Sequence, residues 1–330
     1  MRIAVIGGGS WGTALAVHLG RAGQSVRLWV RERDLCALIT SRHENPWFLP
    51  GVEVPPTVAA TAELEEAVAD AETVVVVVPS EFFGSVIGRI AQALSRSRAI
   101  VSATKGLDPA RHRRMTDLLA EACPGVPVAA LSGPTFAREV AEGRPTAAVI
   151  ACADDRLGRD LQETLGSREL RLYANRDVVG VEIGGALKNV MAIATGLADG
   201  LGLGENARAA LITRGLAEIA RLGVALGASP LTFAGLAGIG DLVLTCTGSL
   251  SRNRALGLAM AAGRKRAEVE AETRMIAEGV RTVTSALALA RTVGVDMPIC
   301  REVGAVLFDD KPAQDALDDL LGRELRREDA

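Results

Sequence analysis

The sequence predicts an α/β protein in which a doubly wound sheet is followed by an all-helical domain. Over the first half of the chain, apolar segments of strand length alternate with helical stretches, and after about residue 178 long alanine- and leucine-rich stretches replace them. Apolar residues make up 48% of the 330 residues, which is enough for a core in each of two domains. We therefore predict one domain over residues 1–178 and a second over residues 179–330.

The predicted strands are short and rich in β-branched residues. The continuous run "TVVVVV" (73–78) is typical of a central parallel strand that is buried on both faces. The other predicted strands are residues 2–6, 25–30, 99–103, 127–131 and 146–151. Strands that alternate with helices indicate a parallel sheet with right-handed crossovers. In the second half, apolar residues at helical spacing predict helices over 179–199, 205–227, 251–262 and 281–293.

A glycine motif follows the first predicted strand and opens a helix. Gly7-x-Gly9-x-x-Gly12 in this context indicates a Rossmann-like dinucleotide-binding turn. Gly7 would allow the tight turn, Gly9 would let the backbone approach a pyrophosphate, and Gly12 would let the helix pack on the strand. The N–H groups at the helix start would face the anion. A glycine-rich turn without a ligand is the alternative.

The second predicted strand ends in "LWVRERD", where a protein that binds NAD usually has an acidic residue. Arg31 stands there instead, with Arg33 nearby, and arginine can receive the 2′-phosphate of NADP. A solvated charged loop would have the same composition. The sequence therefore leaves NAD and NADP open as cofactors.

Four further segments are too polar or too rich in glycine for plain packing. Their candidate residues are Lys105, Gly133, Thr135, Asp241, Ser251, Arg252 and Asn253. The first three follow predicted strands, at the edge of a parallel sheet where ligands bind, whereas Asp241 lies in a glycine-rich turn and Ser251 opens a predicted helix. Each could be an exposed loop residue or a helix cap. Together they supply cations and helix-terminus donors for a bound anion.

Lys188 is the one charged residue between Glu182 and Asp199 in the apolar segment "VEIGGALKNVMAIATGLADG". Burial there would lower the pKa of its amine towards the working range, and a carboxylate such as Asp241 would raise that pKa again. A lysine in this setting suits acid catalysis at a carbonyl oxygen. A lysine whose ammonium extends to the surface is the alternative.

Composition argues against several classes of protein. The net charge of −3 lacks the basic excess of a nucleic-acid-binding protein. The odd number of cysteines (36, 123, 152, 246 and 300), with no closely spaced pair, indicates buried thiols in a reducing compartment and predicts no metal site. The N-terminal apolar run is too short for a signal peptide, and no apolar run approaches the ~20 residues of a membrane span. We expect a cytoplasmic protein without a membrane span.

Short segments along most of the chain form a recognisable series, namely "GGGSWGTALA", "VVVVVPS", "ATKGL", "SGPTFA", "GGALKN", "NARAALITRGLAE", "GDLVLTC", "SRNR" and "AEG". In order and spacing they resemble the bacterial NAD(P)-dependent glycerol-3-phosphate dehydrogenases. The resemblance implies reduction of dihydroxyacetone phosphate to sn-glycerol 3-phosphate, which supplies glycerophospholipid synthesis, and it implies a homodimer.

The resemblance also implies a role for each matching residue. Lys188 corresponds to the general acid/base. The implied substrate contacts are Lys105, Gly133, Thr135, Lys188, Asp241, Ser251, Arg252 and Asn253. With the glycines of the turn (Gly7, Gly9, Gly12), the implied cofactor contacts are Ser10, Trp11, Arg31, Arg33, Lys105, Ala137, Arg252, Ile276 and Glu278. Some relatives have tyrosine or phenylalanine at position 11 and histidine at position 31.

Two other classes stay open from the residues alone. One is a dehydrogenase of the 3-hydroxy-acid or 6-phosphogluconate type, which also has a Rossmann domain and a helical domain; "SRNR" and "GDLVLTC" argue against it. The other is a non-catalytic protein that senses nucleotides, and such a protein would be expected to lack Lys188 or Asp241.

Overall fold

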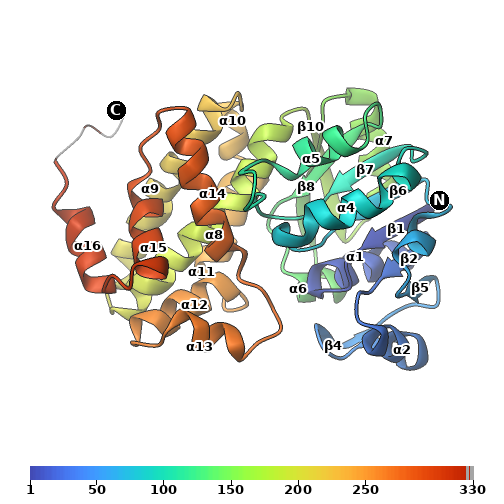
Figure 1. Cartoon of the computed structure of the whole chain (residues 1–330), viewed down its shortest axis with the longest axis horizontal. Helices are drawn as coiled ribbons and strands as arrows, with labels where there is room; N and C mark the ends of the chain where they lie inside the picture. Colours follow the sequence, from blue (N-terminus) through green and yellow to red (C-terminus); the bar gives the residue numbers. More distant parts are fainter. Residues whose placement is uncertain (325–326, 328–330) are drawn as a thin grey trace.

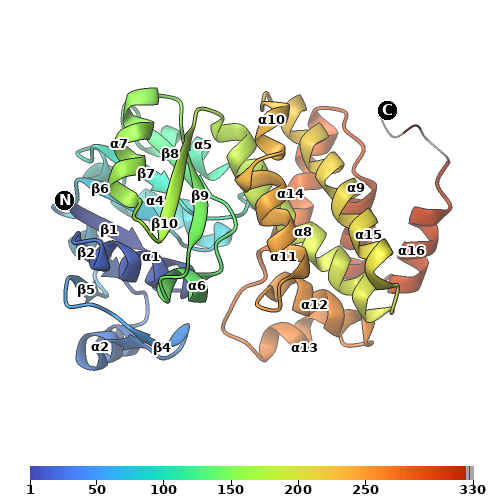
Figure 2. The same ribbon diagram turned by 180° about the vertical axis from the view of Figure 1, so that it is seen from behind.

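The computed structural model describes residues 1–324 and 327 of the chain. A sheet-containing half and a helical half lie side by side, and helix α8 (Val178–Gly200) connects them (Figure 1). Figure 2 shows from behind that the last helix, α16 (Ala313–Leu321), lies at the end of the molecule farthest from the sheet.

An eight-stranded sheet forms the centre of the first half, with the strand order β10-β9-β8-β7-β6-β1-β2-β5. Its strands are β1 (Arg2–Ile6), β2 (Ser25–Trp29), β5 (Val58–Thr61), β6 (Thr73–Val76), β7 (Ala99–Ser102), β8 (Val128–Ser132), β9 (Thr146–Cys152) and β10 (Leu170–Asn175). Every predicted strand is confirmed, and the valine-rich β6 is central and buried at each residue. The edge strands β5 and β10, and the hairpin of β3 (Glu44–Asn45) and β4 (Leu49–Glu53), are additions to the prediction.

Two strands depart from the expected parallel arrangement. β9 is antiparallel to β8, and β10 is parallel to β9, so these two strands oppose the rest of the sheet. Between β8 and β9 the chain forms only the five-residue helix α6 (Ala137–Ala141). A parallel neighbour requires a crossover over the face of the sheet, usually with a full helix. Because α6 is short, the chain turns back beside β8, and the prediction of a parallel strand at 146–151 is wrong.

Helices pack on the sheet, and alternate residues of a strand enter different cores. Ile3 and Val5 of β1 pack with α1, whereas Ala4 and Ile6 pack with α4, as the two-residue period of a strand requires. These two helices belong to the set that covers the sheet. The set consists of α1 (Ser10–Arg21), α2 (Arg33–Arg42), α3 (Leu64–Val68), α4 (Ser80–Leu94), α5 (Met115–Ala122) and α7 (Asp155–Leu165).

Within the described residues after Asn175, every element is a helix, which confirms the helical second half. The predicted helices correspond to α8, α9, α12 and α14. The full set after α8 is α9 (Gly204–Ala225), α10 (Pro230–Phe233), the π-helical turn η1 (Leu236–Gly240), α11 (Asp241–Thr247), α12 (Arg252–Ala261), α13 (Arg266–Ala271), α14 (Glu278–Thr292), α15 (Pro298–Phe308) and α16. The division between residues 178 and 179 falls at the start of α8 and stays a prediction.

Two segments are long and apolar enough to cross a membrane by length and composition alone, Val178–Gly200 and Pro230–Thr247. The prediction that no segment reaches this apolar length is therefore wrong. However, 89% of the apolar window in Val178–Gly200 is buried inside the protein, against 44% for the second segment. A helix that is apolar all round is expected at the centre of a protein, so the burial of α8 accounts for its composition.

Glycines in α8 let its neighbours approach closely. A Cβ at Gly184 would lie 2.4 Å from the carbonyl oxygen of Ala237 in η1, and a Cβ at Gly185 would lie 2.3 Å from the Oγ of Ser132 at the end of β8. Both halves of the protein therefore pack against the turn of α8 that precedes Lys188, and this packing brings residues from both halves to the lysine.

Candidate active site

The carboxyl ends of neighbouring strands bring two of the predicted segments together. Lys105 follows β7, and Gly133 and Thr135 follow β8, which pairs with β7 in parallel. Gly133 has a φ of +138°, and a Cβ there would lie 2.9 Å from the Cα of Ala148, so the turn requires glycine. The Lys105 ammonium donates to the Gly133 carbonyl oxygen at 2.6 Å and to the Thr135 Oγ1 at 2.9 Å.

A single buried carboxylate binds two lysines. Asp241 is fully buried; its Oδ1 accepts from the Lys188 Nζ at 2.5 Å, and its Oδ2 accepts from the Lys105 Nζ at 2.9 Å. The Lys188 side chain is 8% exposed and the Lys105 side chain 14%. Two ammonium groups beside one carboxylate leave an excess of positive charge, which suits an oxygen that becomes negative during a reaction.

Burial lowers the pKa of Lys188 to about 7. Desolvation is the largest cause, because it disfavours the charged amine; the Asp241 carboxylate raises the pKa, and the neighbouring Lys105 ammonium lowers it. The alternative of a lysine that extends to the surface is therefore wrong. An amine that exchanges its proton near pH 7 is suited to acid–base chemistry.

Asp241 lies in a helix rather than in the glycine-rich turn that the sequence predicts. It is the first residue of α11, directly after η1. Short π-helical turns often occur at functional sites, and here η1 places the carboxylate against α8. The alternative that Asp241 is only a helix cap is also wrong, because both of its carboxylate oxygens bind lysines.

Two residues outside the predicted set complete this cluster. Thr245 stands one helical turn after the buried aspartate, and its Oγ1 accepts from the Lys188 Nζ at 2.9 Å. Asn189 donates from its Nδ2 to the Lys105 carbonyl oxygen at 3.0 Å, and its Oδ1 accepts from the Asn253 Nδ2 at 2.9 Å. Both signals stood in the sequence: a threonine four residues after the aspartate, and an asparagine beside the lone lysine of an apolar helix.

Hydrogen bonds from polar residues at the start of α12 fix the position of its first turn. Ser251 is the N-cap residue, and its Oγ accepts from the Arg254 N–H at 3.3 Å. Asn253 is buried, and its Oδ1 accepts from the Gly279 N–H at 3.0 Å. The amides of Asn253 and Asn189 therefore connect α14, α12, α8 and the strand-end loop that carries Lys105.

Arg252 lies between these anchored residues and is exposed. Across residues 1–324 and 327, no hydrogen bond or ion pair involves its guanidinium. Desolvation by the surrounding protein nevertheless lowers its pKa, and the Glu278 carboxylate opposes this shift. An accessible guanidinium with a perturbed pKa is typical of a cation that lines a cleft and can receive an anion.

The glycine turn has the geometry that a dinucleotide requires. Gly7 has a φ of +130°, and a Cβ there would lie 2.8 Å from the Val77 carbonyl oxygen. A Cβ at Gly12 would lie 1.9 Å from the Gly7 carbonyl oxygen, so helix and strand are in close contact. At Gly9 a Cβ would meet nothing within 4 Å, so the centre of the turn is open for a pyrophosphate.

The first turn of α1 places hydrogen-bond donors next to this opening. The Thr13 N–H donates to the Gly9 carbonyl oxygen at 2.9 Å, so the N–H groups of Ser10 and Trp11 precede the first helical hydrogen bond. The Trp11 Nε1 is buried and, within the described chain, has no acceptor. The ring of Trp11 lies 5.9 Å from the Lys105 Nζ, which connects the turn with the lysine cluster. These donors fit a nicotinamide dinucleotide.

The arginines after β2 differ in their partners. Arg31 donates to the Glu32 carboxylate at 2.6 Å, and its guanidinium lies 5.6 Å from the ring centroid of the exposed Phe82. Arg33 pairs with Glu63 at 2.6 Å at the start of α2. Arg31 therefore lies beside an aromatic ring that is absent from the predicted set, whereas Arg33 is tied to a carboxylate of the next loop.

The late cofactor candidates lie at the boundary of the two halves. Glu278 begins α14, and its carboxylate accepts from the Ser80 Oγ at 2.6 Å and from the Ser80 N–H at 3.1 Å, so it caps α4. Ile276 is half-buried in the connector before α14, and its neighbour Met275 places Sδ 3.5 Å from the Ser10 Oγ of the glycine turn. Ala137 begins α6, after β8.

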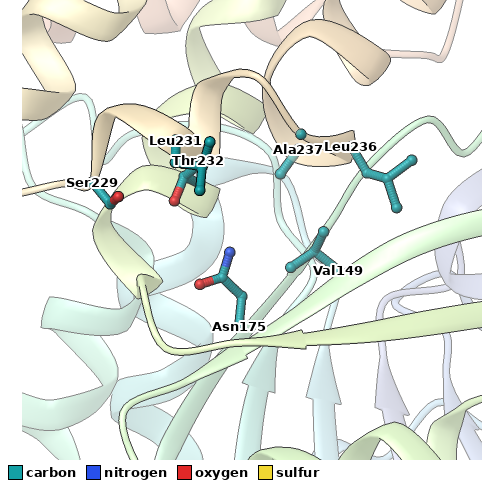
Figure 3. A pocket seen from close by; sticks show the side chains of 8 residues that line it. Val149, Asn175, Ser229, Leu231, Thr232, Leu236 and Ala237 are labelled. Carbon is teal, nitrogen blue, oxygen red and sulfur yellow. The ribbon is translucent and has the colours of Figure 1, made fainter.

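A cavity of about 180 Å³ lies between β9, β10 and the α10–η1 turn (Figure 3). Asn175, Ser229 and Thr232 supply its polar side chains, and Val149, Leu231, Leu236 and Ala237 supply its apolar ones. It has no cationic lining residue, so it does not suit a phosphorylated molecule as the lysine cluster and Arg252 do.

Comparison with known proteins agrees with this arrangement. Residues 2–158 match the N-terminal model, and residues 177–318 the C-terminal model, of the NAD-dependent glycerol-3-phosphate dehydrogenases. The chain is 52% identical over 327 residues to a glycerol-3-phosphate dehydrogenase [NAD(P)+] of Rhodospirillum rubrum, covering 99% of this chain and 93% of that protein. A similar enzyme of Geobacter sulfurreducens is 49% identical, covering 99% of this chain and 98% of that protein.

The fold agrees as well. The crystal structure of glycerol-3-phosphate dehydrogenase from Coxiella burnetii superposes with a TM-score of 0.94 at 41% identity, covering 98% of this chain and 99% of that one. The sequence-based alternatives, a dehydrogenase of another type or a nucleotide sensor without catalysis, are not needed to account for any of these matches. Over nearly its whole length, this chain belongs to the NAD-dependent glycerol-3-phosphate dehydrogenase family.

Proposed function

We propose that this protein catalyses the reversible, NAD(P)H-dependent reduction of dihydroxyacetone phosphate to sn-glycerol 3-phosphate, with Lys188 as the general acid/base. The observation that carries this proposal is the pair of lysines on one buried aspartate. When bound, the nicotinamide cofactor supplies the hydride. The protein must then stabilise the charge on the substrate oxygen and deliver one proton to it.

Lys188 fulfils both requirements. Its ammonium is buried, and Asp241 and Thr245 orient its Nζ. As the carbonyl carbon is reduced, negative charge grows on the oxygen, and a preorganised ammonium stabilises that charge more than it stabilises the neutral ketone. Lys188 then transfers a proton from Nζ to the oxygen, and in the reverse direction it takes the proton from the hydroxyl group. Lys105 adds a second positive charge beside the same site.

The substrate phosphate is assigned to Arg252 and the start of α12. The Arg252 guanidinium has no partner among the described residues and offers a planar fork to phosphate oxygens. The helix N-terminus adds N–H groups. Binding energy at this remote phosphate can orient the carbonyl group at Lys188. The other proposed substrate contacts are Gly133, Thr135, Ser251 and Asn253.

The cofactor is assigned to the glycine turn and its neighbours. Gly7, Gly9 and Gly12, with the donors of Ser10 and Trp11, would hold the pyrophosphate region, and Arg31 would hold the adenosine end. Arg33, Ala137, Ile276 and Glu278 remain proposed contacts. Of these, Arg33 and Glu278 already have ion-pair or hydrogen-bond partners in the protein.

We also propose a cytoplasmic homodimer, in which residues 1–178 bind the cofactor and residues 179–330 carry the catalytic lysine. The free thiols Cys36, Cys123, Cys152, Cys246 and Cys300 are consistent with a reducing compartment. Exposed apolar side chains on the helical half, including Leu231 and Leu250, are available for a dimer interface. Light scattering should give twice the 34.4 kDa of the chain.

The test of the proposed reaction is the oxidation of NADH and NADPH, followed by absorbance, with dihydroxyacetone phosphate as substrate. Dihydroxyacetone is the control for the phosphate, and Lys188→Ala is the control for the chemistry. The proposal requires turnover that depends on both the phosphate group and Lys188. Equal turnover of the two ketones, or none with either cofactor, would contradict it.

A further inference from the structure

The positions of Lys188 and Arg252 are coupled through the contact of α8 with α12. A Cβ at Gly196 of α8 would lie 2.2 Å from the Arg254 carbonyl oxygen, and a Cβ at Gly257 of α12 would lie 2.2 Å from the Ile193 carbonyl oxygen. The two backbones are therefore in direct contact, with no side chain between them. Close backbone contact determines how far apart the helices lie, but it resists sliding only as well as its flanking contacts do.

A buried ion pair lies beside this contact. Arg254 donates to Asp199 Oδ2 from Nε at 2.8 Å and from Nη2 at 2.7 Å. The Asp199 side chain is 6% exposed, and the Arg254 side chain 19%. Two donors from one rigid guanidinium restrict both distance and direction, so this pair opposes sliding and rotation of α12 along α8.

The two helices joined by this ion pair carry the proposed functional residues, Lys188 on α8 and Arg252 on α12. Asp199 and Lys188 lie on the same helix, about 16 Å apart along its axis at about 1.5 Å per residue. Arg254 and Arg252 lie in the first turn of α12. The other anchor of that turn is the Asn253–Asn189 hydrogen bond.

We infer that Asp199 and Arg254 are positioning residues for the phosphate site: their ion pair holds the first turn of α12 on α8, and so sets the position of Arg252 relative to Lys188. The inference rests on the proposed function in one respect, the assignment of the substrate phosphate to Arg252. Neither residue touches the reacting atoms; both act through the backbone that carries Arg252.

The same network contains a matched control. Arg208 on α9 donates from Nε to Asp199 Oδ1 at 2.8 Å and also pairs with the exposed Glu205 at 2.8 Å. Its side chain is 20% exposed, almost the same as that of Arg254. Arg208→Gln therefore removes an arginine from the same carboxylate with the same change of charge, but leaves the contact of α8 with α12 in place.

The test compares the variants Asp199→Asn, Arg254→Gln, Arg254→Lys and Arg208→Gln with wild type, on dihydroxyacetone phosphate and on dihydroxyacetone. We expect Asp199→Asn and Arg254→Gln each to lower kcat/KM for the phosphorylated ketone by about 10- to 100-fold, the effect of a misplacement of about 1 Å. For dihydroxyacetone the change should stay within about twofold, because it has no phosphate to position. Arg254→Lys should fall between, and Arg208→Gln should resemble wild type.

The charge change separates positioning from a simple electrostatic effect. Asp199→Asn removes a negative charge near the phosphate site, whereas Arg254→Gln removes a positive one. If the network acted through its field, the first variant would improve use of the phosphorylated ketone and the second would impair it. Positioning predicts that both impair it. Opposite effects would overturn the inference, and so would equal losses on the two ketones or a loss in Arg208→Gln that matches Arg254→Gln.

Two further measurements keep the outcome decisive. Circular dichroism and thermal unfolding establish that each variant is folded; if Asp199→Asn is not, the comparison of Arg254→Gln and Arg254→Lys with Arg208→Gln decides. Calorimetric titration with sn-glycerol 3-phosphate measures binding without turnover. If wild type binds this ligand but reduces no ketone, the proposed function fails, while the ranking of variants by binding still tests the inference.

Discussion

Lys188 is a charged side chain that is almost completely buried, although burial disfavours the charged form of an amine. The single negative charge of Asp241 only partly stabilises the Lys188 ammonium, because the same carboxylate also binds Lys105. The amine can therefore lose its proton near neutral pH, where an exposed lysine stays charged. In the sequence the same residue is only a charge in an apolar helix.

For Lys188→Ala we predict a fall in kcat of about 10²–10⁴, the range for loss of a general acid. The pH profile is a second signature. With a pKa of about 7, the fraction of Lys188 in the acid form decreases as the pH rises through 7, so ketone reduction should decline and alcohol oxidation should increase. In Lys188→Arg the side chain stays protonated, so this change in rate near pH 7 should disappear. Near-normal turnover of the alanine variant would contradict the assignment.

For Arg252→Ala we predict a large rise in KM for dihydroxyacetone phosphate together with a lower kcat, because the phosphate contact also orients the carbonyl group. Loss of a charge-assisted hydrogen bond of about 1.5–3 kcal/mol corresponds to roughly tenfold to a hundredfold in kcat/KM. Steady-state kinetics on both ketones would measure this. A similar loss with dihydroxyacetone would assign Arg252 to the cofactor or to the fold.

For Arg31→Ala we predict a selective loss of NADPH affinity, by about tenfold to a hundredfold relative to NADH, since one charge-assisted hydrogen bond is worth about 1.5–3 kcal/mol. Because Arg31 shares its guanidinium with Glu32, Glu32→Gln should have the opposite effect and favour NADPH. Parallel KM measurements with both cofactors test the pair. Equal weakening of the two cofactors by Arg31→Ala would make this arginine a general wall of the adenosine site.

Three helices share an uncommon N-terminus, because each is capped by a glutamate from a different helix; Glu182 and Glu218 are buried and Glu278 is half-buried. The N-cap residues of α4, α5 and α15 are Pro79, Arg114 and Met297, and none of them makes a side-chain cap. Glu278 caps α4, Glu182 caps α5 and Glu218 caps α15. Each carboxylate satisfies N–H groups that would otherwise be buried without partners.

Glu218 caps α15 with two hydrogen bonds to backbone N–H groups. It accepts from the Ile299 N–H at 2.7 Å and the Cys300 N–H at 3.3 Å. We predict that Glu218→Ala lowers the free energy of unfolding by about 1–3 kcal/mol, the cost of leaving buried donors unpaired. Urea unfolding would measure it. A change as small as that of an exposed glutamate such as Glu205 would contradict the capping role.

Ionisation of the Glu218 carboxyl group should make the stability of the protein depend on pH. Burial, the largest cause, raises the pKa of Glu218 to about 7, although the two N–H donors lower it. The folded protein therefore holds a proton that the unfolded chain releases near pH 4.5. This contribution is complete below about pH 4.5 and is lost as the pH rises towards 7. Glu218→Gln, which cannot ionise, should flatten this part of the stability profile.

At the scale of the whole molecule, two of the three caps connect the halves. Glu182 on α8 accepts from the Thr116 N–H at 3.0 Å and from the Arg114 Nη1 at 3.3 Å, and Glu278 on α14 binds Ser80. Burial raises the pKa of Glu182 to about 6, against the effect of Arg114. These polar contacts tie α8 and α14 of the helical half to α5 and α4 of the sheet-containing half.

We predict that Glu182→Ala lowers the free energy of unfolding by about 1–3 kcal/mol and uncouples the two halves, so that calorimetry shows a broadened or divided transition. Glu218→Ala is the control, because its cap lies within the helical half; it should lower the transition temperature without dividing the peak. The same peak shape in both variants would mean that Glu182 stabilises α5 without coupling the halves.

Some features of this protein follow from local sequence patterns, and others follow only from long-range packing. Local patterns predict the alternation of strands and helices, the glycine turn, and Lys105, Lys188 and Asp241 as candidate site residues, because hydrophobic period and motif spacing are properties of short segments. They do not predict the direction of β9, which depends on whether the chain crosses the sheet or turns back.

Which functional groups come into contact depends on the packing of the whole fold. Three features depend on contacts between residues far apart in the chain: one aspartate binds two lysines, Arg254 binds Asp199 while Arg252 has no partner among the described residues, and glutamates cap distant helices. A hydrogen bond depends on tenths of an ångström and on direction, and burial sets the pKa of each partner. Both follow from how the helices pack, which no local pattern in the sequence specifies.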